Sequence, residues 1–93
     1  MPNAQAIKDR QEIPVTKKLD AKGLNCPLPI LKTKVVLNKM QPGEILFVEA
    51  TDPHAEIDFE AYCARSRHKL IQVNQNGNVY EFYIRRAEHQ EHS

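Results

Sequence analysis

One cysteine has the local sequence that sulfur chemistry requires: Cys26, in the stretch 23–30. Pro27 and Pro29 follow it, and proline is tolerated in a first helical turn because those N–H groups have no intrahelical partner. The pattern therefore predicts that a helix begins at Pro27, with Cys26 at the N-cap or the first position. A helix N-terminus carries partial positive charge, which favours the nucleophilic thiolate. We therefore expect Cys26 to be partly exposed, with a lowered pKa.

Five neighbours are expected to shape this site. Gly23 gives the preceding loop access to positive φ. Pro27 and Pro29 remove two N–H donors from the first turn, so the backbone N–H groups of Leu28 and Ile30 are expected to face the sulfur.

An apolar stripe runs beside the cysteine through Leu28, Leu31 and Val35, separate from the core face of the same predicted helix. Such residues often pack only against the flank of a helix. Alternatively, they form a surface on which a partner docks. Lys32 and Lys34 are expected to guide an acidic partner, to stabilise an anion on the sulfur, or simply to be solvated. We predict Leu31, Lys32 and Val35 as partner-docking residues.

The other cysteine, Cys63, is expected to be structural. Two cysteines are too few for a disulfide framework, and their spacing is wrong for zinc. Cys63 is predicted on the inward face of a helix beside Tyr62, where a thiol is inert; the alternative is a resolving thiol. His89 and His92 lie in a polar tail without the fixed surroundings that metal ligands need, so no metal site is predicted.

Composition limits the protein to one small domain. The chain has 93 residues, of which 41% are hydrophobic and 6% aromatic, so the core must be modest and mainly aliphatic. The net charge of +1 is weak for a nucleic-acid module. No apolar run is long enough to span a membrane, and no secretory signal is recognisable, so the cytoplasm is the expected location.

Hydrophobic periodicity and turn residues predict four strands and two helices within a domain over 14–87, flanked by a flexible arm over 1–13 and a frayed tail over 88–93. The predicted elements are strand 15–20, helix 27–40, strand 45–48, helix 53–66 or 58–66, strand 70–75 and strand 79–85. Lys17 interrupts the first strand's apolar face and places that strand near a sheet edge.

The helices have recognisable inner faces. Residues at steps of three and four form the core stripe of the first helix: Ile30, Thr33, Val36, Leu37 and Met40. The second helix, capped by Asp52 or Asp58, is expected to bury Phe59, Tyr62 and Cys63, with Ala61 or Ala64.

The last two strands are predicted to form a hairpin. Asn76-Gly77 fits a type I′ turn, which requires positive φ at both central residues. That turn pairs Val73 with Tyr80, and Ile71 with Phe82.

The element order βαβαββ predicts an α+β fold. The first two strands are joined through a helix, as in a parallel crossover. Both helices must cover one face of a four-stranded mixed sheet, which gives a two-layer α/β sandwich.

The stretch Leu19–Pro29 resembles the signature of the TusA/SirA-like sulfur-carrier (sulfurtransferase) family: an Asp, a Gly three residues on, then Cys-Pro-x-Pro opening a helix. The resemblance covers about residues 15–87, with further matches at 40–44, 51–53, Asp58, 62–63 and 84–86. Glu60 departs from it, because some members have proline there. The family's fold is a βαβαββ sandwich.

The resemblance implies that Cys26 accepts sulfur as a persulfide from a cysteine desulfurase or rhodanese and passes it to an acceptor protein. Family members serve tRNA thiolation, molybdenum-cofactor supply or sulfur oxidation. No cofactor is implied beyond the transient cysteine persulfide, and no turnover reaction of the protein's own. Neither membrane association nor direct nucleic-acid binding is expected.

Two alternatives from other classes stay open. One is an RNA- or ribosome-binding module, because the two-layer fold resembles the C-terminal domain of a bacterial translation initiation factor. The other is a thiol-based regulatory protein, in which Cys26 is oxidised and not persulfidated.

Overall fold

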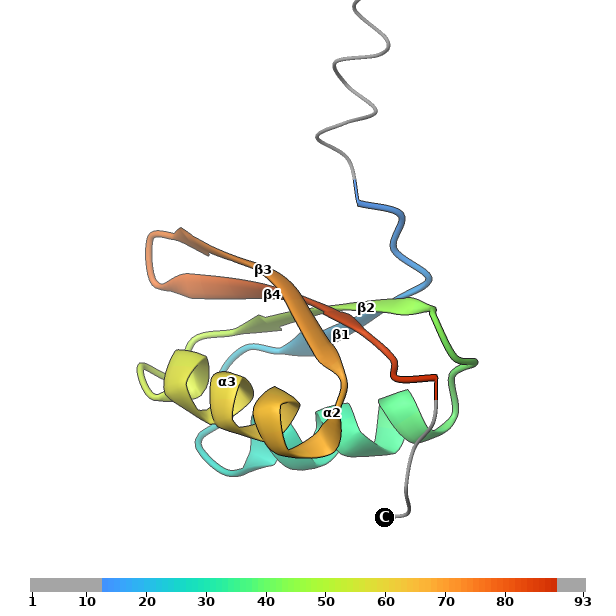
Figure 1. The fold of residues 1–93 in the computed structure, drawn as a ribbon. Helices are drawn as coiled ribbons and strands as arrows, with labels where there is room; N and C mark the ends of the chain where they lie inside the picture. The colour runs from blue at the N-terminus through green and yellow to red at the C-terminus, as the bar shows by residue number, and fades with distance from the viewer. Residues whose placement is uncertain (1–12, 89–93) are drawn as a thin grey trace, which may run out of the picture.

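The computed structural model describes residues 13–88, which form a four-stranded mixed sheet with two helices on one face (Figure 1). All but Ile13 of the predicted arm, and tail residues 89–93, lie outside the described residues. The elements follow the order βαβαββ, which confirms the predicted fold class. They are β1 (Lys17–Ala21), α2 (Leu28–Asn38), β2 (Ile45–Ala50), α3 (Ala55–Ser66), β3 (Lys69–Asn76) and β4 (Val79–Arg85).

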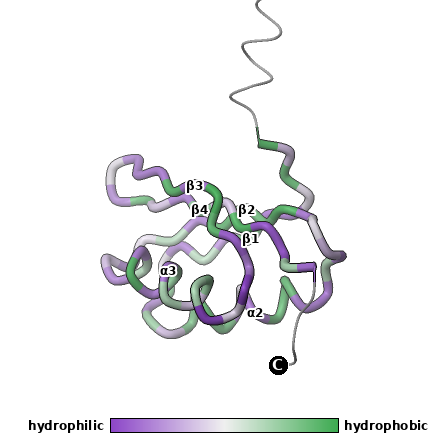
Figure 2. Tube along the Cα trace, in the orientation of Figure 1, coloured by the Kyte–Doolittle hydropathy of each residue, from purple (hydrophilic) through white to green (hydrophobic). Residues whose placement is uncertain are grey.

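The strands lie in the order β1-β2-β4-β3. β1 pairs with β2 in parallel, and the other two pairings are antiparallel. The apolar run of β2 is central, and its Leu46 and Val48 are fully buried. Hydrophobic residues follow β2 through the sheet, whereas hydrophilic residues gather at the tip of the β3–β4 hairpin (Figure 2). β1 is an edge strand, as its interrupting lysine indicates.

The residues predicted for the inner stripe of α2 are buried or partly buried, although α2 ends at Asn38 and Met40 therefore lies just beyond the helix. Thr33 and Leu37 are fully buried, Met40 is nearly so, and Ile30 and Val36 pack partly buried against the same core. The Thr33 hydroxyl donates a hydrogen bond of 2.8 Å to the Pro29 carbonyl, so its buried oxygen is satisfied within the helix.

The inner face of α3 was predicted only in part. Phe59, Tyr62 and Cys63 are buried, and the Phe59 ring stacks on Phe82 of β4 with centroids 4.2 Å apart. Ala61 and Ala64, however, are exposed. The alanine that is buried on the inner face is Ala55. It is the first residue of α3, which therefore begins at neither residue 53 nor residue 58.

The predicted hairpin register is wrong. The turn residues are Gly77 and Asn78, one position later than predicted, because Asn76 still pairs with Val79. Only Gly77 has positive φ, which is typical of a type II′ turn and not of type I′. Val73 therefore pairs with Phe82.

Ile71 does not pair with Phe82 as predicted. It lies at a register shift between Leu70 and Gln72, where a bulge leaves its side chain exposed.

Neither helix within residues 13–88 combines the length and apolar character that crossing a bilayer requires.

Candidate functional site

The loop from β1 to α2 carries Cys26, and the backbone of this loop is fixed by the next loop of the same sheet edge. Gly23 has φ +83°, as predicted, and its N–H donates to Thr51 Oγ1 at 2.9 Å. β1 and β2 are parallel, with Ala21 opposite Ala50, so the loops that follow them leave the sheet side by side.

Asp52 joins these two loops. Its Oδ2 accepts a hydrogen bond of 2.6 Å from the Cys26 N–H, and its Oδ1 accepts one of 3.1 Å from the His54 N–H. These N–H groups hold the pKa of the Asp52 carboxyl below its ordinary value, His54 contributing most. The second bond fixes the turn before α3, as predicted for Asp52, but the N-cap of α3 itself is His54 without a side-chain cap, and the alternative cap Asp58 lies inside the helix. The first anchors the reactive cysteine's own backbone, which the sequence did not indicate.

Cys26 is exposed, as predicted. It lies before the N-cap of the helix, however, and not at the N-cap or the first helical position as expected. Pro27 is the N-cap, α2 begins at Leu28, and the Cys26–Pro27 peptide bond is cis. Pro29 lies buried in the first turn. The Leu28 N–H donates to the Asn25 carbonyl at 2.8 Å, so it is not the free donor toward sulfur that was predicted. The role of the Ile30 N–H stays a prediction.

The electrostatic surroundings of Cys26 contradict the expected thiolate. Hydrogen bonding with the Asp58 carboxylate is the largest influence, and it raises the pKa of the Cys26 thiol. Desolvation and the negative charges of Asp58 and Asp52 act in the same direction. The dipole of α2 alone predicts a thiolate, whereas the carboxylates of Asp52 and Asp58 act on the sulfur from the α3 side. Because like charge disfavours an anion, the resting thiol is protonated.

An apolar patch begins at the first turn of α2. Leu28, Leu31 and Val35 are 44%, 47% and 53% exposed. They border a shallow hollow of about 310 Å³ whose lining residues are Leu19, Leu28, Leu31, Lys32, Val35 and Val36. Among residues 13–88 nothing covers this patch, so its residues do more than pack against the flank of the helix.

The second thiol has a different environment. Cys63 is 5% exposed, and burial raises the pKa of its thiol to about 11. Both cysteines are free thiols. Burial and protonation together make Cys63 the unreactive one, as predicted.

Sequence reasoning missed the part that Asp52 and Asp58 play around the sulfur. Both had been considered only as caps for the second helix. A signal was present: the loop that carries Cys26 and the loop that carries Asp52 follow two strands that were predicted to be parallel. The carboxyl ends of parallel strands meet at one sheet edge, so the two loops had to be neighbours.

The fold is a two-layer βαβαββ sandwich, and it exposes one thiol where a loop of the sheet meets a helix. These two features define a class of small thiol-bearing α+β proteins. The SirA-like protein of Desulfitobacterium hafniense has this fold: its solved structure superposes with a TM-score of 0.69, covering 78% of this chain and 100% of that one at 19% identity. The chain belongs to the TusA family of sulfur carriers, since the family profile, described as Sulfurtransferase TusA, matches residues 17–86.

Individual relatives agree with this assignment. The chain is 42% identical over 71 residues to the sulfur carrier protein TusA of Allochromatium vinosum, covering 76% of this chain and 93% of that protein. It is 41% identical over 71 residues to the putative sulfur carrier protein YrkI of Bacillus subtilis, covering 76% of this chain and 95% of the relative. The region that the family profile matches includes β1 to β4.

Proposed function

We propose that this chain accepts one sulfur atom at a time on Cys26, as a persulfide, and passes it to the thiol of an acceptor protein. The observation that carries the proposal is the exposed Cys26 on a loop anchored by Asp52, in a chain of the sulfur-carrier family whose other thiol is buried. A carrier needs one accessible sulfur and no second one in competition.

The transfer is an exchange between a thiol and a persulfide. Cys26 sulfur attacks the outer sulfur of the donor's persulfide, forming a new S–S bond while the donor's S–S bond breaks. The donor leaves as a thiolate, and Cys26 holds the extra sulfur. An acceptor thiolate then attacks that outer sulfur and releases Cys26, so no external oxidant or reductant is consumed.

The Asp58 carboxylate affects the protonation of the thiol that takes part in this exchange. Asp58 is the largest influence that raises the pKa of the Cys26 thiol, so the thiol holds its proton more tightly than an ordinary cysteine. The thiol proton must therefore leave as the sulfur attacks, and the departing donor thiolate takes up a proton, so the exchange balances. Between transfers, the raised pKa keeps the Cys26 thiol in its less easily oxidised form, which argues against a thiol sensor, because oxidation follows thiolate character.

The apolar patch of Leu28, Leu31 and Val35, with Lys32, is the surface on which donor and acceptor dock in turn. It starts two residues after the reacting cysteine, so a partner seated on it has its own sulfur close to Cys26. A cysteine desulfurase or a rhodanese is the proposed donor, acting in the reducing cytoplasm. tRNA thiolation, molybdenum-cofactor supply and sulfur oxidation are the proposed uses.

Loading by a donor tests the proposal. The chain is incubated with a cysteine desulfurase and L-cysteine and then examined by intact mass. We expect additions of about 32 Da per sulfur, in the native chain and in the matched control Cys63→Ala, and none in Cys26→Ser. An adduct that survives Cys26→Ser, or no adduct with several desulfurases and rhodaneses, contradicts the proposal.

A further inference from the structure

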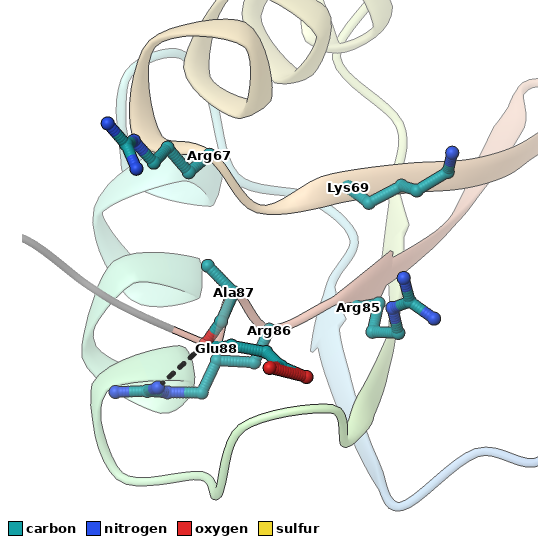
Figure 3. Close-up of a pocket in the computed structure, with 6 residues that line it drawn as sticks. All are labelled: Arg67, Lys69, Arg85, Arg86, Ala87 and Glu88. Atoms are coloured by element: carbon teal, nitrogen blue, oxygen red, sulfur yellow. Dashed lines mark hydrogen bonds between the residues drawn. The ribbon is translucent and has the colours of Figure 1, made fainter.

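Four basic side chains surround a hollow at the opposite end of α3 from Cys26. The hollow has a volume of about 280 Å³, and its lining residues are Arg67, Lys69, Arg85, Arg86, Ala87 and Glu88. α3 has twelve residues, so about 18 Å along its axis separate this end from the Cys26 end. In Figure 3, Arg67 and Arg86 extend to one side and Lys69 and Arg85 to the other, with Glu88 between them.

Within the described part of the chain, no ion pair balances the positive charge of this hollow. Lys69 and Arg85 are direct partners across β3 and β4, and like charges in that position destabilise a sheet. Ion pairs within residues 13–88 join Lys22 to Asp20 and Glu49, and His54 to Asp52; none involves the basic residues of the hollow. Glu88 is the sole carboxylate among the lining residues.

Arg67 also has a backbone conformation that destabilises the fold. It ends α3 with φ +76°, the left-handed conformation that glycine normally supplies at this position. A side chain there is strained, and strained positions are often functional. The chain thus tolerates two local penalties, and both place a cation beside the same hollow.

Arg86 supplies a cation that is already fixed. Its Nε donates to the Leu37 carbonyl at 2.8 Å and its Nη1 to the Ala87 carbonyl at 3.1 Å, so the guanidinium is held against the end of α2. A fixed charge loses little freedom when a ligand binds.

We infer that this hollow binds a small phosphate-bearing anion. Arginine guanidinium groups match phosphate oxygens in bidentate geometry, and the volume is at the lower end of small-molecule sites. The lining offers Ala87 as its one apolar residue, so it lacks the aromatic or aliphatic anchors of a protein interface. The net charge of the chain, +1, is weak for binding RNA.

Amide NMR of the full chain tests the inference, with inorganic phosphate exchanged for chloride at fixed ionic strength so that general screening stays constant. We expect saturable shifts at residues 67–69 and 85–88. Arg67→Gly and Arg85→Gln weaken phosphate binding about fivefold or more, because each removes a charged donor. Both relieve a local penalty, so both are expected to fold. Glu88→Gln tightens binding, since it removes the repelling carboxylate.

The matched control is Lys18→Gln, which removes the same charge from the exposed face of the opposite edge strand. It leaves phosphate binding unchanged, and so does Cys26→Ser, since the site is independent of sulfur transfer. Linear shifts at every cationic residue, or equal binding by Arg85→Gln and native chain, overturn the inference. Saturation of the hollow by an RNA oligonucleotide or a glutamate-rich peptide, but not by phosphate, also overturns it.

Discussion

The buried thiol of Cys63 makes the stability of this domain fall at alkaline pH by a calculable amount. Burial raises the pKa of this thiol from 9.0 to about 11. Below about pH 9 both states hold the proton; between 9 and 11 the unfolded chain releases it first. A raised folded pKa is therefore stabilisation that is lost as pH rises through that window. The difference between the pKa of the folded and the unfolded state lowers the unfolding free energy by roughly 2 kcal/mol at pH 11.

Urea unfolding of the native chain and of Cys63→Ala, from about pH 8 to pH 11 with reductant present, measures this loss. Cys63→Ala leaves a small cavity that costs about 1 kcal/mol at every pH, so the slopes are compared and not the absolute values. Burial raises the pKa of Tyr62 in both proteins, whereas the smaller increase that comes from the charge of Cys63 is present only in the native chain. We expect the native chain to lose about 2 kcal/mol more than the variant. Parallel pH profiles would refute the reasoning.

Three further substitutions test other parts of the structure. Asp58→Asn removes the strongest influence that raises the pKa of Cys26, so iodoacetamide should alkylate Cys26 faster at neutral pH; an unchanged rate contradicts the assigned role. Leu31→Asp should change the unfolding free energy by no more than about 0.5 kcal/mol, because the side chain is 47% exposed. The same substitution should slow sulfur loading several-fold. Normal loading kinetics would exclude Leu31 from the docking surface. Arg85→Gln should raise the unfolding free energy by about 0.5 kcal/mol, since it ends the repulsion from Lys69; a urea midpoint below that of the native chain would contradict this.

Periodicity predicted the architecture because each inner face has a clear pattern. The α2 stripe through Thr33 and Leu37 and the apolar run of β2 sufficed to place both helices on one side of a mixed sheet. The hairpin could not be predicted equally well. Its register depends on which two residues form the turn, and Asn76-Gly77 and Gly77-Asn78 are both good turn pairs. The bulge at Ile71 then shifts the rest of β3, and no local signal marks it.

The candidate site shows the same division. Cys26, Gly23 and the proline-rich first turn were recognisable because they are contiguous in sequence. The thiol's protonation was not, because it depends on Asp58, which lies more than thirty residues away and acts only through the folded contact. Helix-dipole arguments cover the first turn alone; carboxylates from another helix lie outside them. Asp52 was predicted only as a cap of the turn before α3, whereas its long-range hydrogen bond with the Cys26 N–H was not predicted.

The most direct test of the central claim is whether sulfur on Cys26 moves on. The chain is loaded with labelled sulfur by a desulfurase, separated from the donor by gel filtration, and mixed with a reduced acceptor thiol protein. We predict that the label leaves Cys26 and appears on the acceptor in equal amount, with the Cys26 thiol regenerated. Label that stays on Cys26, or leaves only as free sulfide without reaching the acceptor, would contradict the assignment of this chain as a carrier.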